Sequence, residues 1–369
     1  MNKKAIFSVG TALTFVAGTA QAAYDLNLRA PKTEIASQIY SLHMLIMYVC
    51  IAIFILVFGV MFYSIYKHRK SVGHQAVQFH EHHLLEVVWT IIPALILIAM
   101  AVPATKTIFA MKDTSAADMT VKVTGHQWKW EYDYLDKNVR FISTLATSQD
   151  QINGKDEKSE NYLLEVDNPM VVPTGKKVRV LLTATDVIHA WWVPAFGVKQ
   201  DAIPGFIKEV WFKVDEPGTY RGQCAELCGK DHGFMPIVVE AKSETDYNAW
   251  IESKTAEAAT ANAGAEKEWT KDDLVANGKT VYEKNCAACH MADGAGMPPN
   301  FPALTGSKVA TGPIEGHLNI ILNGKNVMPA WKAILNDVEI ASVIAYERNA
   351  LGNSAGDIIQ PAAVKAARK

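Results

Sequence analysis

Two long apolar runs dominate the N-terminal third of the chain, at residues 42–66 and 84–111, and both predict membrane-spanning helices. Residues 46–62 carry no charge, and this run is long enough to cross about 30 Å of hydrocarbon as a helix. The second run contains Pro93 and Pro103, which membrane helices tolerate with a local kink. Residues 23–118 therefore predict a transmembrane hairpin.

A shorter apolar run precedes the hairpin and has the pattern of a secretory signal. Residues 5–17 follow two lysines and end before Ala-Gln-Ala at residues 20–22. We expect residues 1–22 to be cleaved after Ala22; an uncleaved anchor is the alternative, although the run is short for a span. Three cations follow the first span, and positive residues stay on the cytoplasmic side: Lys67, Arg69 and Lys70. Both termini are therefore expected on the outer side of a bacterial cytoplasmic membrane.

Glu86 lies near the inner end of the second run, and an ionisable residue in a membrane segment is a functional candidate. The alternative is an interfacial carboxylate at a helix start, which the helix dipole favours. The connector before Glu86 is rich in histidine. A metal site is one interpretation and a solvated polar loop is the one we prefer for these four residues: His74, His80, His82 and His83.

Residues 119–242 predict an all-β domain. Apolar and polar residues alternate over 178–182 and 210–214, and residues 236–240 form another short strand-like run. Turn signals separate these runs: Asn153-Gly, Pro173-Thr-Gly and Glu216-Pro-Gly. Several short strands with turns between them are typical of a Greek-key sandwich.

The remainder of the chain predicts a linker, a helical domain and a tail. Residues 243–268 are small and polar, with no apolar face to bury. Residues 269–352 contain two capped helices: one starts at Thr270-x-x-Asp273 with Leu274, Gly278 and Tyr282 on one side. The other starts at Asn336 with Glu339 and buries Ile340, Val343 and Ile344. Residues 353–369 predict a loose, slightly basic tail.

The richest chemistry lies between Arg221 and Met235, where two thiols, an imidazole and a thioether occur together: Cys224, Cys228, His232 and Met235. A further imidazole, His189, lies at the end of an earlier strand-like run. Soft sulfur ligands favour copper, and the set is too large for tetrahedral zinc or a blue-copper site. Two copper ions that share two bridging thiolates would use all five residues. A disulfide and a zinc site remain alternatives, but neither accounts for the position of Met235.

A second motif, Cys286-Ala-Ala-Cys289-His290, lies in the helical domain. In an exported chain, Cys-x-x-Cys-His predicts covalent attachment of c-type haem, with the histidine as one axial ligand; a chance redox pair is the alternative. The second axial ligand should be a methionine. Met291 is too close to His290 to reach the opposite haem face. Met328-Pro-Ala-Trp is preferred over Met297-Pro-Pro because it lies before the last helix.

Composition narrows the classes of function. The 369 residues carry a net charge of −2, which gives no case for nucleic acid as a partner. Four of the five cysteines fall in the two ligand motifs, and Cys50 in the first span is expected to be a small buried hydrophobe.

These motifs together resemble subunit II of haem-copper cytochrome c oxidase. The resemblance rests on His189-Ala-Trp191, on Asp201-Ala-Ile-Pro-Gly205 and on Cys-x-Glu-x-Cys-Gly-x-x-His-x-x-Met from Cys224. With the haem motif, the chain is most similar to the caa-type version, in which a cytochrome c is fused to subunit II. The resemblance implies a cupredoxin domain with a binuclear copper centre and an all-α class I cytochrome c domain.

The resemblance also implies roles for individual residues. Trp128 of Gly-His-Gln-Trp matches the exposed residue at which electrons reach the copper pair, although Lys129 follows it where the family often has tyrosine. Glu226 would give its carbonyl to copper, and its side chain would bind magnesium at the interface with subunit I. Glu86 matches the acidic residue at the mouth of a proton-uptake channel.

The expected function is therefore an electron relay. Electrons would be accepted at the haem and passed through the copper pair to subunit I, where oxygen is reduced to water and protons are pumped. Expected partners are subunit I, subunit III, membrane lipid, and as donor a cytochrome c or a quinol–cytochrome c reductase complex. The alternatives are a membrane-anchored copper delivery protein, a copper-free quinol oxidase subunit, and nitrous oxide reductase, which would lack the two spans and Glu86.

Overall fold

The computed structural model describes residues 27–368, apart from 74, 76–79, 138, 300, 327 and 333. The expected signal, residues 1–22, and His74 of the connector lie outside the described residues. The chain divides at Ala30 into two units, and the elements below all belong to the second, Pro31–Lys369.

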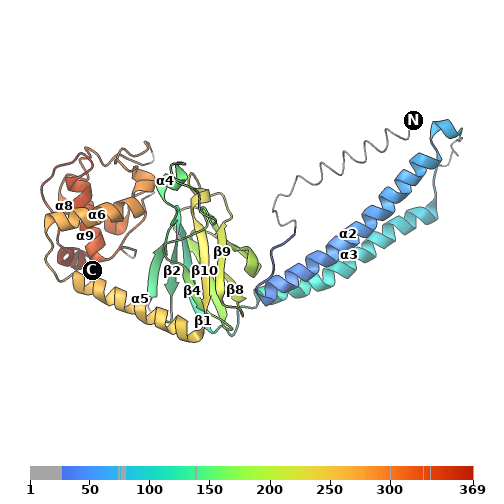
Figure 1. Cartoon of the computed structure of the whole chain (residues 1–369), viewed down its shortest axis with the longest axis horizontal. Coiled ribbons are helices and arrows are strands. Elements are labelled where there is room, and N and C mark those ends of the chain that lie inside the picture. Colours follow the sequence, from blue (N-terminus) through green and yellow to red (C-terminus); the bar gives the residue numbers. More distant parts are fainter. Residues whose placement is uncertain are drawn as a thin grey trace. The chain divides into compact units, whose positions relative to one another are not determined.

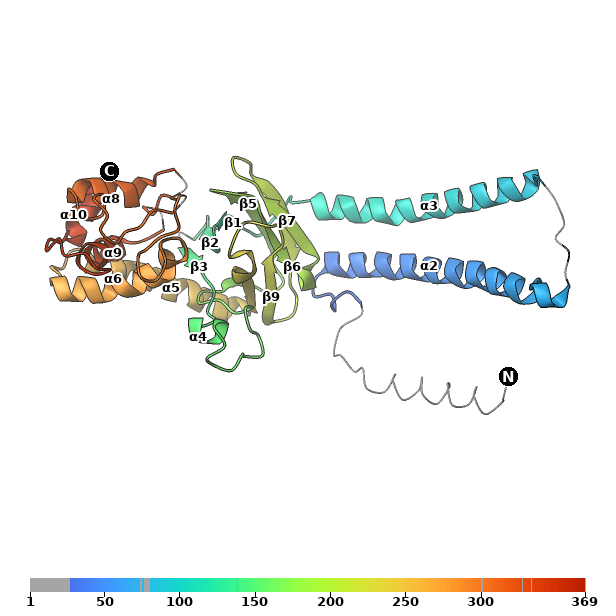
Figure 2. The same cartoon turned by 90° about the horizontal axis from the view of Figure 1, so that it is seen from above.

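Two long helices, α2 (Glu34–Lys67) and α3 (His83–Lys112), form an antiparallel pair that lies side by side in both views (Figures 1 and 2). A short 3-10 helix, η1 (Lys70–Val72), lies in the connector. Helix α2 begins at Glu34 and not at residue 42, because the Thr33 side chain accepts a hydrogen bond from the backbone N–H of Ala36. The Thr33 hydroxyl in turn donates to the Phe196 carbonyl of the β domain at 2.7 Å.

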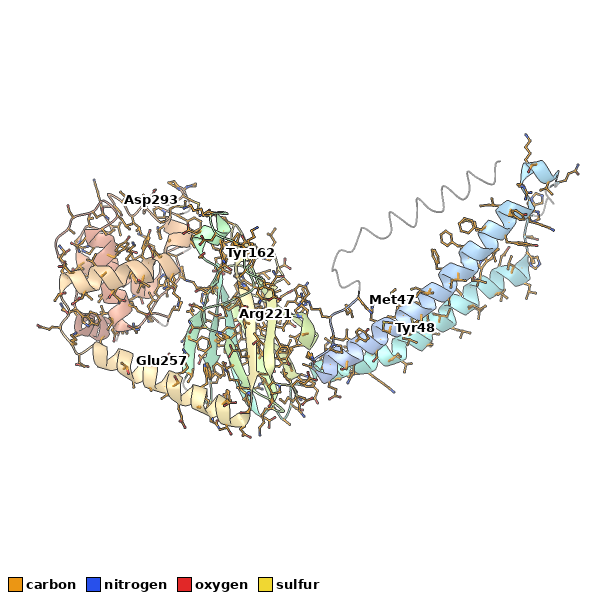
Figure 3. The ribbon with its side chains drawn as sticks, in the orientation of Figure 1. Met47, Tyr48, Tyr162, Arg221, Glu257 and Asp293 are labelled. Carbon is orange, nitrogen blue, oxygen red and sulfur yellow. The ribbon has the colours of Figure 1, made fainter. Side chains whose placement is uncertain are left out.

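Both helices are long and apolar enough to cross a membrane, and large apolar side chains project from them into the surroundings. Figure 3 shows Met47 and Tyr48 pointing away from α2. Tyr48 is 63% exposed and Leu56 is 67% exposed. In water such surface would be unfavourable, so these side chains fit a lipid environment.

The β domain consists of two five-stranded sheets (Figure 1). The first has the order β3-β2-β1-β5-β8 and the second the order β4-β10-β9-β6-β7. The strands are β1 (Met119–His126), β2 (Lys129–Tyr134), β3 (Val139–Ser143), β4 (Met170–Pro173), β5 (Lys177–Ala184), β6 (His189–Val193), β7 (Val198–Ala202), β8 (Lys208–Lys213), β9 (Gly218–Cys224) and β10 (Pro236–Lys242). The short helices α4 (Gln149–Ile152), η2 (Pro194–Phe196) and η3 (His232–Phe234) lie in the connections.

The core lies between the two sheets, as the alternating pattern predicts. Val178, Val180 and Leu182 of β5 are buried, and β5 pairs in parallel with β1 so that Val180 lies opposite Val121. Aromatic rings fill the space between the sheets: Trp130, Tyr132 and Tyr134 of β2, Trp191 of β6 and Phe212 of β8 are all buried.

Residues 243–268 were expected to have no apolar face, and this expectation is wrong. Most of the segment forms α5 (Glu244–Gly264), whose first two turns pack on the β domain. Tyr247 is 4% exposed, and the Trp250 ring lies 5.3 Å from the ring of Tyr134. Three apolar side chains within five residues, with Ile251 the third, are enough to anchor one end of the helix.

The helical domain contains α6 (Lys271–Asn285), α7 (Ala287–His290), α8 (Ile314–Asn323), α9 (Asp337–Asn349) and α10 (Pro361–Ala367). Both predicted caps are confirmed, at Thr270 and at the capping box of Asn336 and Glu339. Helix α6 crosses α9 closely at Gly278, where a Cβ atom would lie 2.0 Å from the Ser342 carbonyl oxygen.

The tail is a second correction. Residues 353–369 were expected to be loose, but α10 buries Pro361 and Val364. Arg368 forms an ion pair with Asp337 at the start of α9, and its side chain also donates to the carbonyl of Leu335 at 2.5 Å. A short helix with few apolar residues is stabilised here by packing on α9 and by the contacts of the cation at its C-terminal end.

Candidate metal centre and haem cavity

Five potential ligands converge at one end of the β domain. Cys224 ends β9 and Cys228 lies in the following loop, and their sulfur atoms are 3.8 Å apart. The Nδ1 atom of His189 lies 3.9 Å from the Cys224 sulfur, and that of His232 lies 3.4 Å from the Cys228 sulfur. The Met235 sulfur lies 3.5 Å from the Cys228 sulfur. A disulfide needs a separation of about 2.05 Å, so the two cysteines are free thiols facing one another.

The two thiols titrate as a coupled pair. A hydrogen bond from Cys228 lowers the pKa of Cys224 far below that of an ordinary thiol. The same contact raises the pKa of Cys228, because a second negative charge would lie beside the first. Positive charge between the sulfurs would remove this conflict. A donor set of two facing thiols, two imidazoles and a thioether fits soft metal ions such as copper.

His189 is fixed in orientation by Asp186, a residue that sequence analysis did not single out. The Nε2 atom of His189 lies 2.9 Å from Asp186 Oδ1, which leaves Nδ1 to face the sulfurs. Burial lowers the pKa of His189, but the hydrogen bonds with Asp186 and Cys224 outweigh it and raise the pKa overall. A carboxylate behind a metal-binding histidine typically fixes the ring and strengthens it as a ligand. The Asp-x-x-His spacing was the available signal.

A glycine makes room for this histidine. A Cβ atom at Gly125 would lie 2.8 Å from Cδ2 of the His189 ring. Gly125 is the next-to-last residue of β1, which ends at His126, so the Gly-His-Gln-Trp motif begins directly against a metal ligand. The imidazole can occupy its position only because residue 125 has no side chain.

Trp128 was expected to be exposed, and the structure contradicts this. The residue is 8% exposed, and its indole N–H donates to the Cys228 carbonyl at 3.1 Å. The side chain of Gln127 donates to the same oxygen at 2.8 Å, while the backbone N–H of Gln127 donates to Asp186. These bonds hold the indole down against the loop between the two cysteines. Trp128 is therefore hydrogen-bonded to the metal-binding loop, and it is buried instead of lying free on the surface.

Glu226, between the two cysteines, has an exposed side chain. Its backbone carbonyl oxygen lies 3.4 Å from the Cys224 sulfur. The carbonyl therefore faces the ligand cluster while the carboxylate faces away from it.

The haem motif lines a cavity of about 320 Å³ in the helical domain. Cys286, Cys289, His290 and Met328 all line it, and Met297 and Met291 do not. The Nδ1–H group of His290 donates to the Pro302 carbonyl at 2.9 Å, so Nε2 is the nitrogen left for a metal. Two thiols, an imidazole and a thioether on one apolar cavity fit a covalently attached haem.

The same cavity has a polar wall that the motifs did not predict. His317 and Glu347 both line it, and His317 Nε2 lies 2.7 Å from Glu347 Oε2. The other ring nitrogen, Nδ1, is buried without a hydrogen-bond partner within the described part of the chain.

Glu86 lies in the first turn of α3, and its carboxylate accepts a hydrogen bond from the backbone N–H of His82 at 3.2 Å. His82 Nδ1 in turn accepts from the Leu85 N–H. His80, His82 and His83 are solvent-exposed. The cluster of possible metal ligands found within the described residues is His189, Cys224 and Cys228.

We predict that Gly125→Ala will displace the His189 ring and reduce copper retention at least tenfold, because loss of one ligand position weakens the site. Copper content after dialysis against a chelator measures this. Gly233→Ala is the matched control, since residue 233 also adjoins a ligand but a Cβ there would meet nothing within 4 Å. Equal copper content in the two variants would contradict the prediction.

Comparisons with known proteins agree with the motifs. The model of the cytochrome c oxidase subunit II periplasmic domain matches residues 119–242, and that of the subunit II transmembrane domain matches residues 21–107. The model of cytochrome c oxidase, cbb3-type, subunit III matches residues 273–346. A crystal structure of the periplasmic domain of subunit II of cytochrome oxidase (CoxB) from Bradyrhizobium japonicum is 46% identical, covering 38% of this chain and 96% of its own, with a TM-score of 0.35.

Two curated relatives each match more than half of the chain. The probable cytochrome c oxidase subunit 2 of Rickettsia bellii is 36% identical over 237 residues, which are 64% of this chain and 86% of the relative. Cytochrome c oxidase subunit 2 of Cereibacter sphaeroides is 39% identical over 233 residues, which are 60% of this chain and 77% of the relative. The chain belongs to the cytochrome c oxidase subunit II family and carries a fused C-terminal cytochrome c domain.

Proposed function

We propose that this chain accepts electrons at its cytochrome c domain and passes them through its cupredoxin domain to subunit I of the oxidase, where oxygen is reduced to water and protons are pumped. The observation that carries the proposal is the pair of unbonded sulfurs 3.8 Å apart, surrounded by two imidazoles and a thioether. Bound copper would supply a centre that changes charge by one electron within a fixed, soft ligand set.

The residues of this site have distinct proposed tasks. Cys224 and Cys228 would bridge two copper ions, with His189, His232, Met235 and the Glu226 carbonyl as terminal ligands. Asp186 would hold His189 in its orientation, which is supported by the 2.9 Å contact with Nε2. The exposed carboxylate of Glu226 is proposed to bind magnesium at the interface with subunit I.

Trp128 is proposed as the residue through which electrons enter the cupredoxin domain. Its indole donates a hydrogen bond to the backbone of the bridging Cys228, which gives a short path to the copper ligands. Cys286 and Cys289 would attach the haem, and His290 and Met328 would bind its iron. Haem, when attached, supplies a second one-electron centre with a potential that the methionine raises.

The proposal also covers the membrane location of the chain and the subunits beside it. We propose that α2 and α3 anchor the chain in a bacterial cytoplasmic membrane beside subunits I and III, with both soluble domains on the outer side. The electron donor would be a cytochrome c or a quinol–cytochrome c reductase complex.

The purified oxidase tests the copper proposal directly. We expect two copper ions per chain in addition to the copper of subunit I, and an electron paramagnetic resonance spectrum of one unpaired electron shared by both ions. Cys228→Ser should abolish the shared signal, because serine lacks the soft bridging sulfur. One labile copper per chain would favour a copper delivery protein, and zinc at this position would also overturn the relay.

The haem ligand can be assigned by paired substitutions. Met328→Ala should remove the sulfur–iron absorption band and lower the haem potential, whereas Met297→Ala should retain both, because Met328 lines the cavity with His290. Optical spectra and a redox titration of the purified complex measure the two quantities. The opposite pattern would transfer the role to Met297.

Glu86 is proposed to lie at the mouth of a proton-uptake channel. Glu86→Ala should slow proton uptake severalfold while the copper and haem spectra stay unchanged, because the residue lies far along α3 from both soluble domains. Glu81→Ala, which removes an exposed carboxylate of the same connector, is the control. Unchanged turnover in the Glu86 variant would refute the role and leave the helix-start interpretation.

A further inference from the structure

Lys129 is the charged residue that follows Trp128, and it is 5% exposed. Its ammonium group lies over the ring of Trp331, 4.0 Å from the ring centre, and its Nζ atom lies 3.5 Å from the carbonyl oxygen of Asn285. Both contacted residues belong to the cytochrome domain, while Lys129 begins β2 of the cupredoxin domain. A single buried cation therefore connects the two domains.

The two contacts of Lys129 lie on either side of the proposed haem ligands. Asn285 ends α6, immediately before Cys286, and Trp331 closes the loop that begins at Met328. Asn285 and Trp331 both line the haem cavity, as does Gln127 of the cupredoxin domain. The cavity is therefore bounded partly by the segment that carries Trp128.

The cation keeps its charge despite its burial. Desolvation lowers the pKa of Lys129 to about 8. At neutral pH the side chain is still mostly an ammonium. A desolvated ammonium over a tryptophan ring is among the stronger cation–π contacts, because no water competes for the charge.

A second, independent contact joins the same two domains. The Nζ atom of Lys284 in α6 lies 2.5 Å from Oδ2 of Asp167 in the cupredoxin domain. The side chain of Cys289 also packs against the apolar core of the sandwich. An ion pair and an apolar contact therefore join the two domains in addition to Lys129.

We propose that Lys129, supported by the Asp167–Lys284 ion pair, holds the cytochrome domain of this chain on the Gln127–Trp128 face of its own cupredoxin domain. Lys129 is a positioning residue: it takes no electron itself, but it keeps the haem cavity beside the indole. This proposal rests on the proposed relay and adds the residue that fixes its internal geometry.

One consequence concerns the external donor. With the cytochrome domain held in place, the Trp128 face is covered, so a soluble cytochrome c would have to deliver its electron to the cytochrome domain.

The test uses the complete oxidase complex with Lys129→Met, which keeps the buried aliphatic stem and removes the charge. We expect amide hydrogen exchange in the segments of Gln127–Trp128 and Met328–Trp331 to accelerate about tenfold, and electron transfer from the photoreduced cytochrome domain to slow by a similar factor. Lys129→Arg should change both quantities less than Lys129→Met does, because a guanidinium also binds over an aromatic ring.

Three controls make the result decisive. Lys137→Gln removes an exposed cation that follows the same strand and should change neither measurement. Unchanged copper and haem spectra show that both domains of Lys129→Met are folded and loaded; if they are not, Lys284→Glu takes its place with the same expected acceleration. Wild-type exchange and transfer in the loaded variant would overturn the positioning role, while absence of the shared copper signal in the wild type would overturn the relay itself.

Discussion

The structure depends on holding two thiols in contact without letting them bond. Cys224 is fixed at the end of β9, which lies between β10 and β6, and Trp191 of β6 is its partner across the strand pair. Cys228 belongs to the loop that Gln127 and Trp128 hold by two hydrogen bonds to its carbonyl. A rigid sandwich on one side and a clamped loop on the other keep the sulfurs at a distance that metal ions can bridge.

Asp186 connects the metal centre to the surface where the domains meet. One carboxylate oxygen orients His189, and the other accepts the backbone N–H of Gln127 at 2.7 Å. The residue that sets a ligand's direction therefore also sets the segment that contacts the cytochrome domain. A displacement of Gln127 would therefore also displace His189, because both hydrogen bonds to Asp186 are short and partly buried.

Local patterns predicted the elements, and long-range contacts decided what the patterns missed. The period-2 alternation of β5, the caps of α6 and α9 and the spacing of both cysteine motifs depend on neighbours in sequence, so they could be read directly. The burial of Trp128 and the anchoring of Tyr247 depend on surfaces that are remote in the chain. The polar composition of residues 243–268 gave no sign that α5 packs on the sandwich. A few apolar residues at one end are enough to anchor a helix when a partner surface is present.

The length of helix α5 sets both the spacing of the two domains and the direction in which the chain leaves the helix. Its first turns pack on the sandwich, and its last residue, Gly264, accepts a hydrogen bond from the indole of Trp269 at 3.0 Å. Each residue of an α-helix advances the chain by about 1.5 Å and turns it by about 100°. Insertion of one alanine in its middle would rotate everything beyond it by that angle, whereas insertion of seven would restore nearly the same orientation further out. The direction in which the chain leaves this helix therefore depends on the number of its residues.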